Sequence, residues 1–394
     1  ANRYEDRQPY GCRSFFLWGT QEVFMLKPMF GVVALTLLTS HTTLGATVTG
    51  GGASMPAKLY KGSADSILPI NFSYAASGSG IGKTAFLMNN PMLLGATTGT
   101  VHYIGSDSIL SSSELSAYST NYRGAYGPLI QIPLAGTAVT IPYKKPDITD
   151  LNLTSAQLCD AFSGAKVTWG QLLGNPADRT PIRIVYQRGG SGATELLTRH
   201  LNSVCPTRFA TNSIFTNARL PAGGALPSNW VAVQPYESVR NAVDNVSGSI
   251  GYEGPDGVDL SDNSKIARVN GLLPTLANRV IAVRSVAPPG VAADRADPSK
   301  WIPVFVNPNA GYSIVGYTNF VFGQCYKDAT VAADLRAFLT QHYGGTTTNR
   351  AVADHRFVPL VASWKSAIMS AFITGTSENL AINNPSVCNG KGRP

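Results

Sequence analysis

Short apolar runs that end in Gly/Ser turns and lead into helical patterns recur along the chain, and this alternation restricts the fold more than any other feature. Residues 70–74 predict a strand, residues 77–82 form a Gly/Ser loop, and a helix is predicted over 83–89. Residues 182–186 begin the same order again, with a Gly-rich turn and a helix over about 194–201. This repetition predicts an α/β architecture with open sheets.

Four turns are rich in serine and glycine, and at least three of them lead into helical patterns. They cover residues 50–55, 77–80, 106–108 and 189–192. The amino end of a helix presents unpaired backbone N–H groups and the positive end of the helix dipole, which together bind oxyanions. Glycine lets the backbone approach closely, and serine adds a hydroxyl donor. Because only 14% of the residues are charged, the four turns predict a desolvated anion site between two lobes.

Single residues in these turns also have simpler interpretations. Asp107 follows a predicted strand over residues 101–105, where a Ser-Asp-Ser sequence commonly caps a turn or a helix. Arg188 alone would fit a surface charge, and Lys83 is expected to be a solvated helix residue. The anion-site prediction therefore depends on the four turns together.

Two segments approach catalytic motifs without meeting their requirements. Residues 77–84 (SGSGIGKT) have serine where a P-loop has its first glycine. Residues 189–193 (GGSGA) have Ala193 where a nucleophile elbow has its second glycine. The chain has five histidines, and none forms an obvious partner for a nucleophilic serine. These departures disfavour an NTPase and a serine hydrolase.

Helix start and stop signals place further helices. Ser111 with Glu114, and Thr154 with Gln157, have the spacing of capping boxes, so a helix is expected to begin after each pair. A further helix is predicted over residues 333–343, where two glycines follow.

The amino-terminal residues predict export. Lys27 and the apolar residues 29–38 are followed by small and polar residues up to Ala46, which is the order of a secretory signal peptide over 25–46. Residues 1–24 precede this segment and are not expected to be part of the fold. The net charge of the whole chain is +8 at pH 7. This charge suits an anionic ligand, and solubility alone would also account for it.

The cysteine count agrees with an oxidising compartment. After removal of a segment that contains Cys12, the even number of four cysteines remains: Cys159, Cys205, Cys325 and Cys388. Three pairings of these four are possible, and we expect each cysteine to pair with its neighbour in the sequence. The chain has no C-x-x-C pair, so neither a zinc site nor a redox site is expected.

Several of these segments resemble the DING family of phosphate-binding proteins. Residues 50–56 (GGGASMP) look like the family's GGGATLP opening. Residues 74–86 (YAASGSGIGKTAF), 102–115 (HYIGSDSILSSSEL) and 185–202 (VYQRGGSGATELLTRHLN) are similar to three further blocks. The resemblance covers essentially all of 47–394.

The resemblance implies the type II-like fold of periplasmic phosphate receptors, with two α/β lobes joined by crossing strands and a ligand cleft between them. Lobe I is expected to comprise residues 47–138 plus 255–394, and lobe II residues 139–254. Pairing of sequence-neighbouring cysteines fits the family's two disulfides.

The resemblance also implies phosphate contacts at Ser54, Met55, Ser79, Asp107, Arg188, Ser191 and Gly192. The serine hydroxyls and the backbone N–H groups would donate hydrogen bonds to the anion. Asp107 would accept a hydrogen bond from the phosphate's own proton, which sulfate lacks.

Two positions depart from the family's pattern. Gln187 stands where the family has an arginine, four residues before Ser191, so that Arg188 would clamp the anion only if the loop bends. Ala193 stands where the family has a threonine, which removes one hydroxyl donor.

The expected function is the binding of inorganic phosphate, in the periplasm or after secretion, for uptake by an ABC-transporter permease. We expect a monomer without cofactor, metal or nucleic-acid partner. The alternatives are a secreted phosphatase of the same family and an extracellular adhesion protein that retains the fold.

Overall fold

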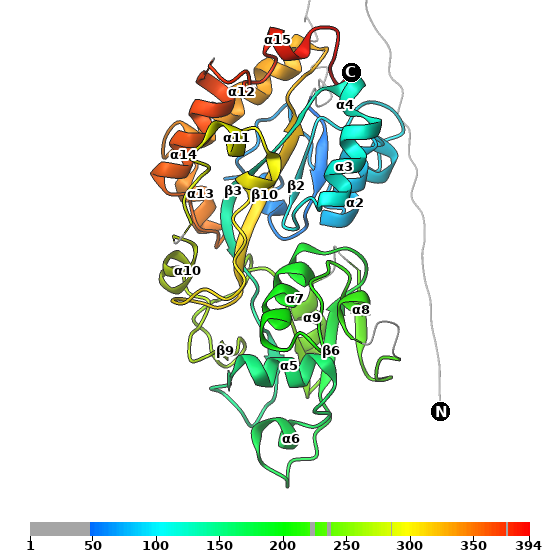
Figure 1. Ribbon diagram of the computed structural model, residues 1–394. Coiled ribbons are helices and arrows are strands. Elements are labelled where there is room, and N and C mark those ends of the chain that lie inside the picture. Colours follow the sequence, from blue (N-terminus) through cyan, green and yellow to red (C-terminus); the bar gives the residue numbers. More distant parts are fainter. Residues whose placement is uncertain (1–47, 221–224, 235–237, 285, 376) are drawn as a thin grey trace, which may run out of the picture. The chain divides into compact units, whose positions relative to one another are not determined.

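The computed structural model describes residues 48–220, 225–234, 238–284, 286–375 and 377–394. The predicted signal peptide and the residues before it, with Cys12, lie outside the described residues. The predicted α/β class is confirmed, because the described chain contains two four-stranded sheets, each flanked by helices (Figure 1).

The first sheet has the strand order β1-β2-β10-β3. Its strands are β1 (Gly50–Gly52), β2 (Tyr103–Ser106), β10 (Val315–Gly323) and β3 (Leu129–Ala138). β1 and β2 are parallel, whereas β10 runs antiparallel to both β2 and β3. The carboxyl ends of β1 and β2 therefore lie at the same edge. Residues 50–52 of the first predicted turn form β1 itself, and the rest of that turn and the third turn follow at this edge.

Helices cover this sheet on both sides, with α2 (Ser79–Leu87) and α3 (Ser112–Asn121) on one side and α12 (Ala329–Tyr343) and α14 (Ala362–Ile368) on the other (Figure 1). The remaining elements outside the second sheet are short or peripheral: α1 (Ala57–Tyr60), η1 (Pro91–Leu94), α4 (Arg123–Tyr126), α10 (Leu276–Val283), α11 (Ala292–Arg295), η2 (Pro298–Trp301), α13 (Asn349–Asp354), the π-helical turn η3 (Met369–Thr374) and α15 (Pro385–Cys388).

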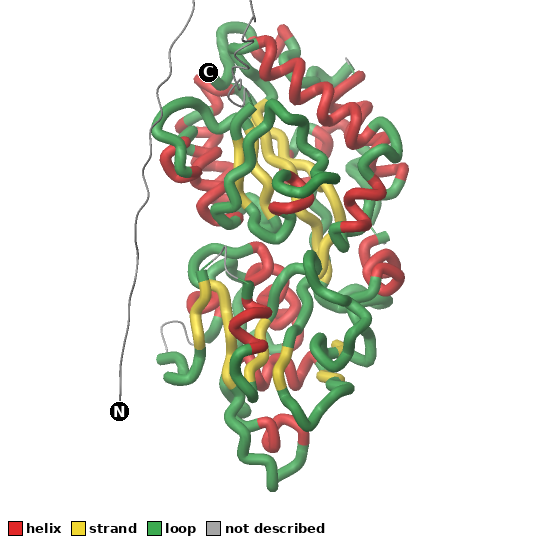
Figure 2. Tube along the Cα trace, turned by 180° about the vertical axis from the view of Figure 1, so that it is seen from behind, coloured by secondary structure: helices red, strands yellow, loops and turns green. Residues whose placement is uncertain are grey.

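The second sheet has the order β4-β8-β6-β7. Its strands are β4 (Tyr143–Lys144), β8 (Ser249–Gly251), β6 (Arg183–Gln187) and β7 (Val231–Val233). Its helices are α5 (Ser155–Ser163), α6 (Trp169–Leu173), α7 (Gly192–Val204), α8 (Phe215–Ala218) and α9 (Val239–Asp244). Seen from behind, the strands form two separate groups, one for each sheet (Figure 2).

The chain passes between the two sheets in several neighbouring segments. Thr140, just after β3, pairs with Glu253, just after β8, and Val139 donates a backbone hydrogen bond to Ile314, just before β10. All strands of the first sheet fall in the predicted lobe I and all strands of the second in the predicted lobe II. The small sheet of β5 (Asn152–Leu153) and β9 (Arg268–Val269) pairs one strand from each predicted portion. The exact division at 138/139 and 254/255 remains a proposal.

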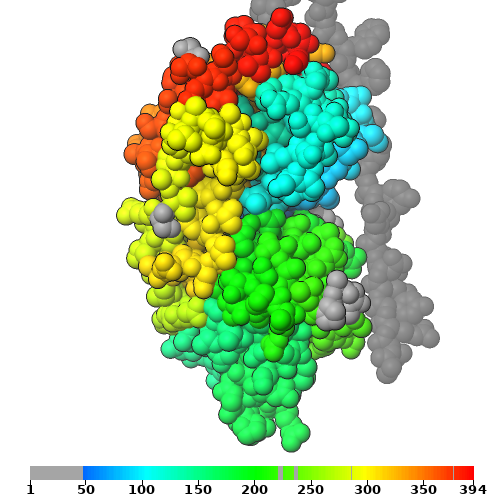
Figure 3. All heavy atoms as spheres, viewed as in Figure 1, coloured from blue at the N-terminus to red at the C-terminus, as the bar shows by residue number. Residues whose placement is uncertain are grey.

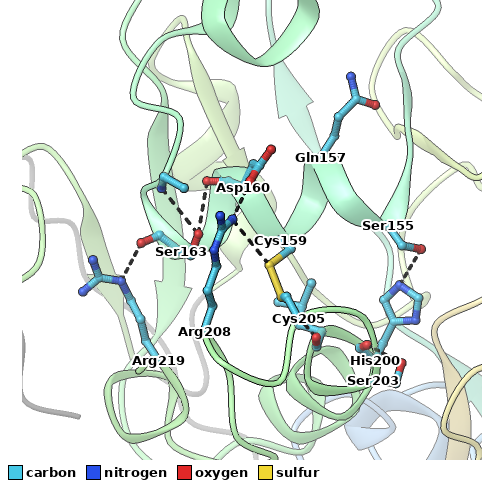
Figure 4. The surroundings of a disulfide bond; sticks show 12 residues. Ser155, Gln157, Cys159, Asp160, Ser163, His200, Ser203, Cys205, Arg208 and Arg219 are labelled. Atoms are coloured by element: carbon cyan, nitrogen blue, oxygen red, sulfur yellow. Dashed lines mark hydrogen bonds and ion pairs between the residues drawn. A yellow bond between two sulfur atoms is a disulfide. The ribbon is translucent and has the colours of Figure 1, made fainter. Parts of the chain in front are cut away.

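Both expected disulfides are formed. Cys159 in α5 is bonded to Cys205 at the end of α7, beside an ion pair between Arg208 and Asp160 (Figure 4). The second disulfide lies beside the first sheet, where Cys325, just after β10, is bonded to Cys388.

The carboxyl-terminal residues pack against the elements around the first sheet. Arg393 is fully buried, and its guanidinium lies 3.7 Å from the ring centroid of Phe86 and donates to the carbonyl oxygen of Val101. Gly392 donates to the carbonyl oxygen of Ala125 in α4. In the space-filling view the last residues (red) accordingly lie near α3 and α4 (cyan) (Figure 3).

Local signals predict some helix ends better than others. Both capping boxes are present, so α3 and α5 begin as predicted after Ser111 and Thr154. The helix predicted over 83–89 instead begins at Ser79, because the Gly/Ser loop itself enters the helix. The strand predicted over 70–74 is wrong, since within that range only Phe72 forms an isolated bridge, to Val48.

Candidate anion site

Asp107 is the buried charge at the edge of the first sheet. It directly follows β2, is 2% exposed, and its Oδ1 has no hydrogen-bond partner among the described residues. Burial raises the pKa of this carboxyl to about 7, and the nearby hydroxyl of Thr318 offsets part of the rise. A buried acceptor without a partner costs free energy, so this oxygen is available to a donor that a ligand could supply.

Ser79 lies against Asp107 at the first residue of α2. Its Oγ accepts a 3.1 Å hydrogen bond from the backbone N–H of Asp107, and the residue is 1% exposed. The preceding Gly78 has φ of 89°, a conformation that favours glycine, and it donates to the carbonyl oxygen of Gly52. The start of α2 is thereby fixed to the end of β1.

Ser54 stands on the other side of β1's carboxyl end. The preceding Ala53 donates a backbone hydrogen bond to Gly105 in β2, which holds the turn against the strand that leads to Asp107. The Oγ of Ser54 is buried and has no partner among the described residues. Ser54 and Met55 lead into α1, and both line a cavity of about 310 Å³.

The amino end of α7 brings donors from the second sheet. Ser191 is the N-cap of this helix, and its side chain accepts from the backbone of Thr194. A Cβ on Gly192 would lie 2.2 Å from the Cβ of Asp107, so only glycine permits this approach. Gly190 accepts a 3.2 Å hydrogen bond from the backbone of Gly80 in α2. The two predicted halves of the site therefore meet.

The structure separates the two neighbouring residues at the end of β6. Gln187 is buried and lines the same cavity as Ser54 and Met55. Arg188 is exposed, and its backbone N–H continues the pairing with β7 by donating to Val233. Successive side chains along a strand point to opposite faces, so Arg188 lies away from the cavity that Gln187 lines. The anion-binding role of Arg188 stays a prediction without support from this placement.

Sequence reasoning missed several polar groups beside Asp107. The hydroxyls of Tyr60 and Thr318 and the Oδ1 of Asn319 are buried and have no partner among the described residues. Burial raises the pKa of the Tyr60 phenol, and the nearby charge of Asp107 adds to the rise. Thr318 and Asn319 belong to the wholly buried strand β10. Two polar residues inside an otherwise apolar run were the available signal.

Lys83 corrects an expectation. Lys83 was predicted to be solvated but is only 7% exposed, because its side chain reaches from α2 to α3 and forms a 3.1 Å ion pair with Glu114. Its ammonium also donates to the carbonyl oxygen of Ile109. The local sequence around Lys83 could not predict this ion pair, because Glu114 belongs to a different helix.

The described residues hold neither a metal-binding cluster nor a membrane-spanning helix. No group of three or more histidine, cysteine, aspartate or glutamate side chains suited to hold a metal ion occurs among them. None of the helices they form has the length and apolar character needed to cross a bilayer.

Two α/β sheets joined by several neighbouring segments, with donors from both around a buried carboxylate, define a periplasmic binding protein. The chain matches the model of the PBP superfamily domain over residues 39–340. It therefore belongs to that superfamily and, as its relatives show, to the DING phosphate-binding proteins within it.

The relatives carry two kinds of name. The phosphate-binding protein of Stenotrophomonas maltophilia is 45% identical, with a TM-score of 0.80 over 88% of this chain and 99% of that one. PfluDING, a high-affinity periplasmic phosphate-binding protein solved with phosphate, is 38% identical, with the same TM-score and the same coverage. Alkaline phosphatase L of Pseudomonas aeruginosa is 67% identical over 94% of this chain and 100% of its own length.

Proposed function

We propose that this protein binds inorganic phosphate outside the cytoplasm and presents it to an ABC-transporter permease. The observation that carries the proposal is the unpartnered, buried carboxylate oxygen of Asp107, which lies against Ser79 and the amino end of α7. Relatives named for phosphate binding share the whole fold. A periplasmic or secreted location and a monomeric state follow from the same family membership and are part of the proposal.

The arrangement explains how phosphate would be told from sulfate. Serine hydroxyls and helix N–H groups donate to any oxyanion. An ionised Asp107 accepts only from an anion that still carries a proton. Phosphate keeps a proton near neutral pH and sulfate does not, so sulfate would leave the buried carboxylate without a donor and facing a second negative charge.

Calorimetric titration tests the proposal. The purified protein is stripped of bound anion by unfolding and refolding with its disulfides intact, and is then titrated with sodium phosphate and with sodium sulfate. We expect one phosphate per chain and no heat from sulfate. Absence of phosphate binding by protein whose circular dichroism shows refolding would refute the function.

An Asp107→Asn variant supplies the specific control. The amide retains an acceptor but removes the charge that repels sulfate. We expect the preference for phosphate over sulfate to fall by at least about tenfold, or ~1.4 kcal/mol. An unchanged preference would show that Asp107 does not select the ligand.

A second candidate function is hydrolysis of phosphate esters, which the phosphatase name of the 67% identical relative favours. The serine hydroxyls at the site offer nucleophiles, and the candidate requires one of them to be activated by a base. Release of p-nitrophenol from its phosphate ester by the pure protein, lost in Ser191→Ala, would support this candidate. Phosphate binding without any turnover would leave the receptor function alone.

A further inference from the structure

The charge of the ligand follows from Gln187, and this inference rests on the proposed phosphate-binding function. At the end of β6 the residue that lines the cavity shared with Ser54 and Met55 is Gln187, whose side chain is a neutral amide rather than a guanidinium. The Gln187 backbone N–H donates to the hydroxyl of Tyr252, which is 2.8 Å from Thr194 in the first turn of α7. Gln187 is thus held beside the helix end that approaches Asp107.

The cations near the site are already paired or solvated. Lys83 forms its ion pair with Glu114, and Arg199 forms a 2.7 Å ion pair with Glu195. Lys58 lines the cavity from α1 but is exposed to solvent. Among the described residues around the anion, no buried cation is left to neutralise a second negative charge.

Carboxylates near the site add negative charge that no buried cation offsets. Glu253 and Asp256 line the cavity. The Oδ2 of Asp256 lies 3.2 Å from the Nδ1 of His355. Glu195 of α7 accepts a 3.3 Å hydrogen bond from the backbone of Ile109, two residues beyond Asp107. The other titratable groups that face Asp107 are the phenols of Tyr60 and Tyr74. A doubly charged anion would meet a negative field in a desolvated place.

We propose that the site takes phosphate as the monoanion, with Asp107 and Gln187 each accepting one of its two O–H protons. The glutamine side chain has a carbonyl oxygen that can accept a hydrogen bond, whereas arginine has donors only. The two O–H groups of dihydrogen phosphate then find two acceptors, and its remaining oxygens accept from the hydroxyl and N–H donors of the two sheets. Gln187 is therefore the residue that sets the protonation state of the ligand.

Proton counting makes the proposal measurable. Above neutral pH free phosphate is mainly the dianion and Asp107 is mainly ionised, so binding the monoanion requires one proton from solution. Apparent affinity should then fall by about tenfold for each pH unit above the second ionisation of phosphate. A site that binds the dianion takes up no proton and shows no such fall.

The experiment is calorimetric titration of the anion-free protein with sodium phosphate at pH 8 in two buffers of different ionisation enthalpy. We expect uptake of about one proton per phosphate in the unaltered protein. Gln187→Arg should lower the uptake toward zero, since the guanidinium favours the dianion and offers no acceptor. The matched control, Gln341→Arg at an exposed position of α12, should behave like the unaltered protein.

The outcomes separate this inference from the function beneath it. Phosphate binding by the unaltered protein without proton uptake, or an uptake unchanged by Gln187→Arg, overturns the inference and leaves the function intact. No phosphate binding at any pH defeats the function itself. If Gln187→Arg does not fold, Gln187→Met removes the acceptor without adding charge, and it must also reduce the uptake.

Discussion

Replacement of Gly192 by alanine would test whether the two halves of the site must close on each other. The added Cβ would lie 2.2 Å from the Cβ of Asp107 and 2.7 Å from its carbonyl carbon. These two atoms of Asp107 are its carbonyl carbon and its Cβ, which are fixed by the backbone, so neither can move aside as the end of a flexible side chain could. Non-bonded carbon atoms normally lie about 3.5–4.0 Å apart. Helix α7 would therefore have to move away from Asp107 by roughly 1 Å or more to reach that separation.

The cost falls on the closed arrangement and therefore on ligand affinity. Overpacking of this kind typically costs about 1–3 kcal/mol, which corresponds to a phosphate dissociation constant raised roughly 5- to 150-fold. An opened form relieves the clash, so the melting temperature of the anion-free protein should change little.

Calorimetry with phosphate and thermal unfolding without it measure the two quantities. Gly345→Ala is the control, because an added Cβ there meets nothing within 4 Å. Unchanged phosphate affinity in Gly192→Ala, with the fold intact, would refute the view that α7 must touch Asp107 for binding.

Three further predictions concern stability. Because burial raises the pKa of Asp107 to about 7, the anion-free protein loses stability as pH rises from the ordinary carboxyl range through 7, so Asp107→Asn should stabilise it more at pH 8 than at pH 5; equal gains in urea unfolding at both pH values would contradict this. Replacing Cys159 and Cys205 by serine opens a connection with a sequence separation of 46 and should lower the free energy of unfolding by about 4 kcal/mol in the chain-entropy model, as measured by urea denaturation. Arg393→Ala removes a fully buried guanidinium with its carbonyl and aromatic contacts and should cost at least ~3 kcal/mol, whereas a melting temperature equal to that of the unaltered protein would show that the contacts contribute nothing.

Local signals predicted much of the site because the ligand groups belong to turns. A Gly/Ser sequence before a helix reports its own conformation, so the four turns were predicted to form one anion site, and the resemblance to the DING family then implied Ser54, Ser79 and Ser191. The same reasoning could not show that Gly192 touches Asp107, since that contact joins residues 85 positions apart in the numbering and depends on how the sheets are connected.

Long-range packing accounts for what the sequence concealed. Lys83 looked solvated because its partner Glu114 lies on another helix. Thr318 and Asn319 lie inside an otherwise apolar strand, and strand pairing places Asn319 opposite Ser106, the residue before Asp107. The pairing of β10 with β2 spans more than half the chain, and no local pattern encodes it.

The route of the chain also sets the order in which the molecule can be built. Every strand of the second sheet lies between Tyr143 and Gly251, so this half is complete in one stretch of synthesis. The first sheet begins at Gly50 but needs β10, and its disulfide closes only when Cys388 has been made. Its early strands must wait, unpaired with β10, while the second half emerges. We therefore expect a newly made chain to remain incompletely folded until Cys388 has been made, well after the second sheet is complete.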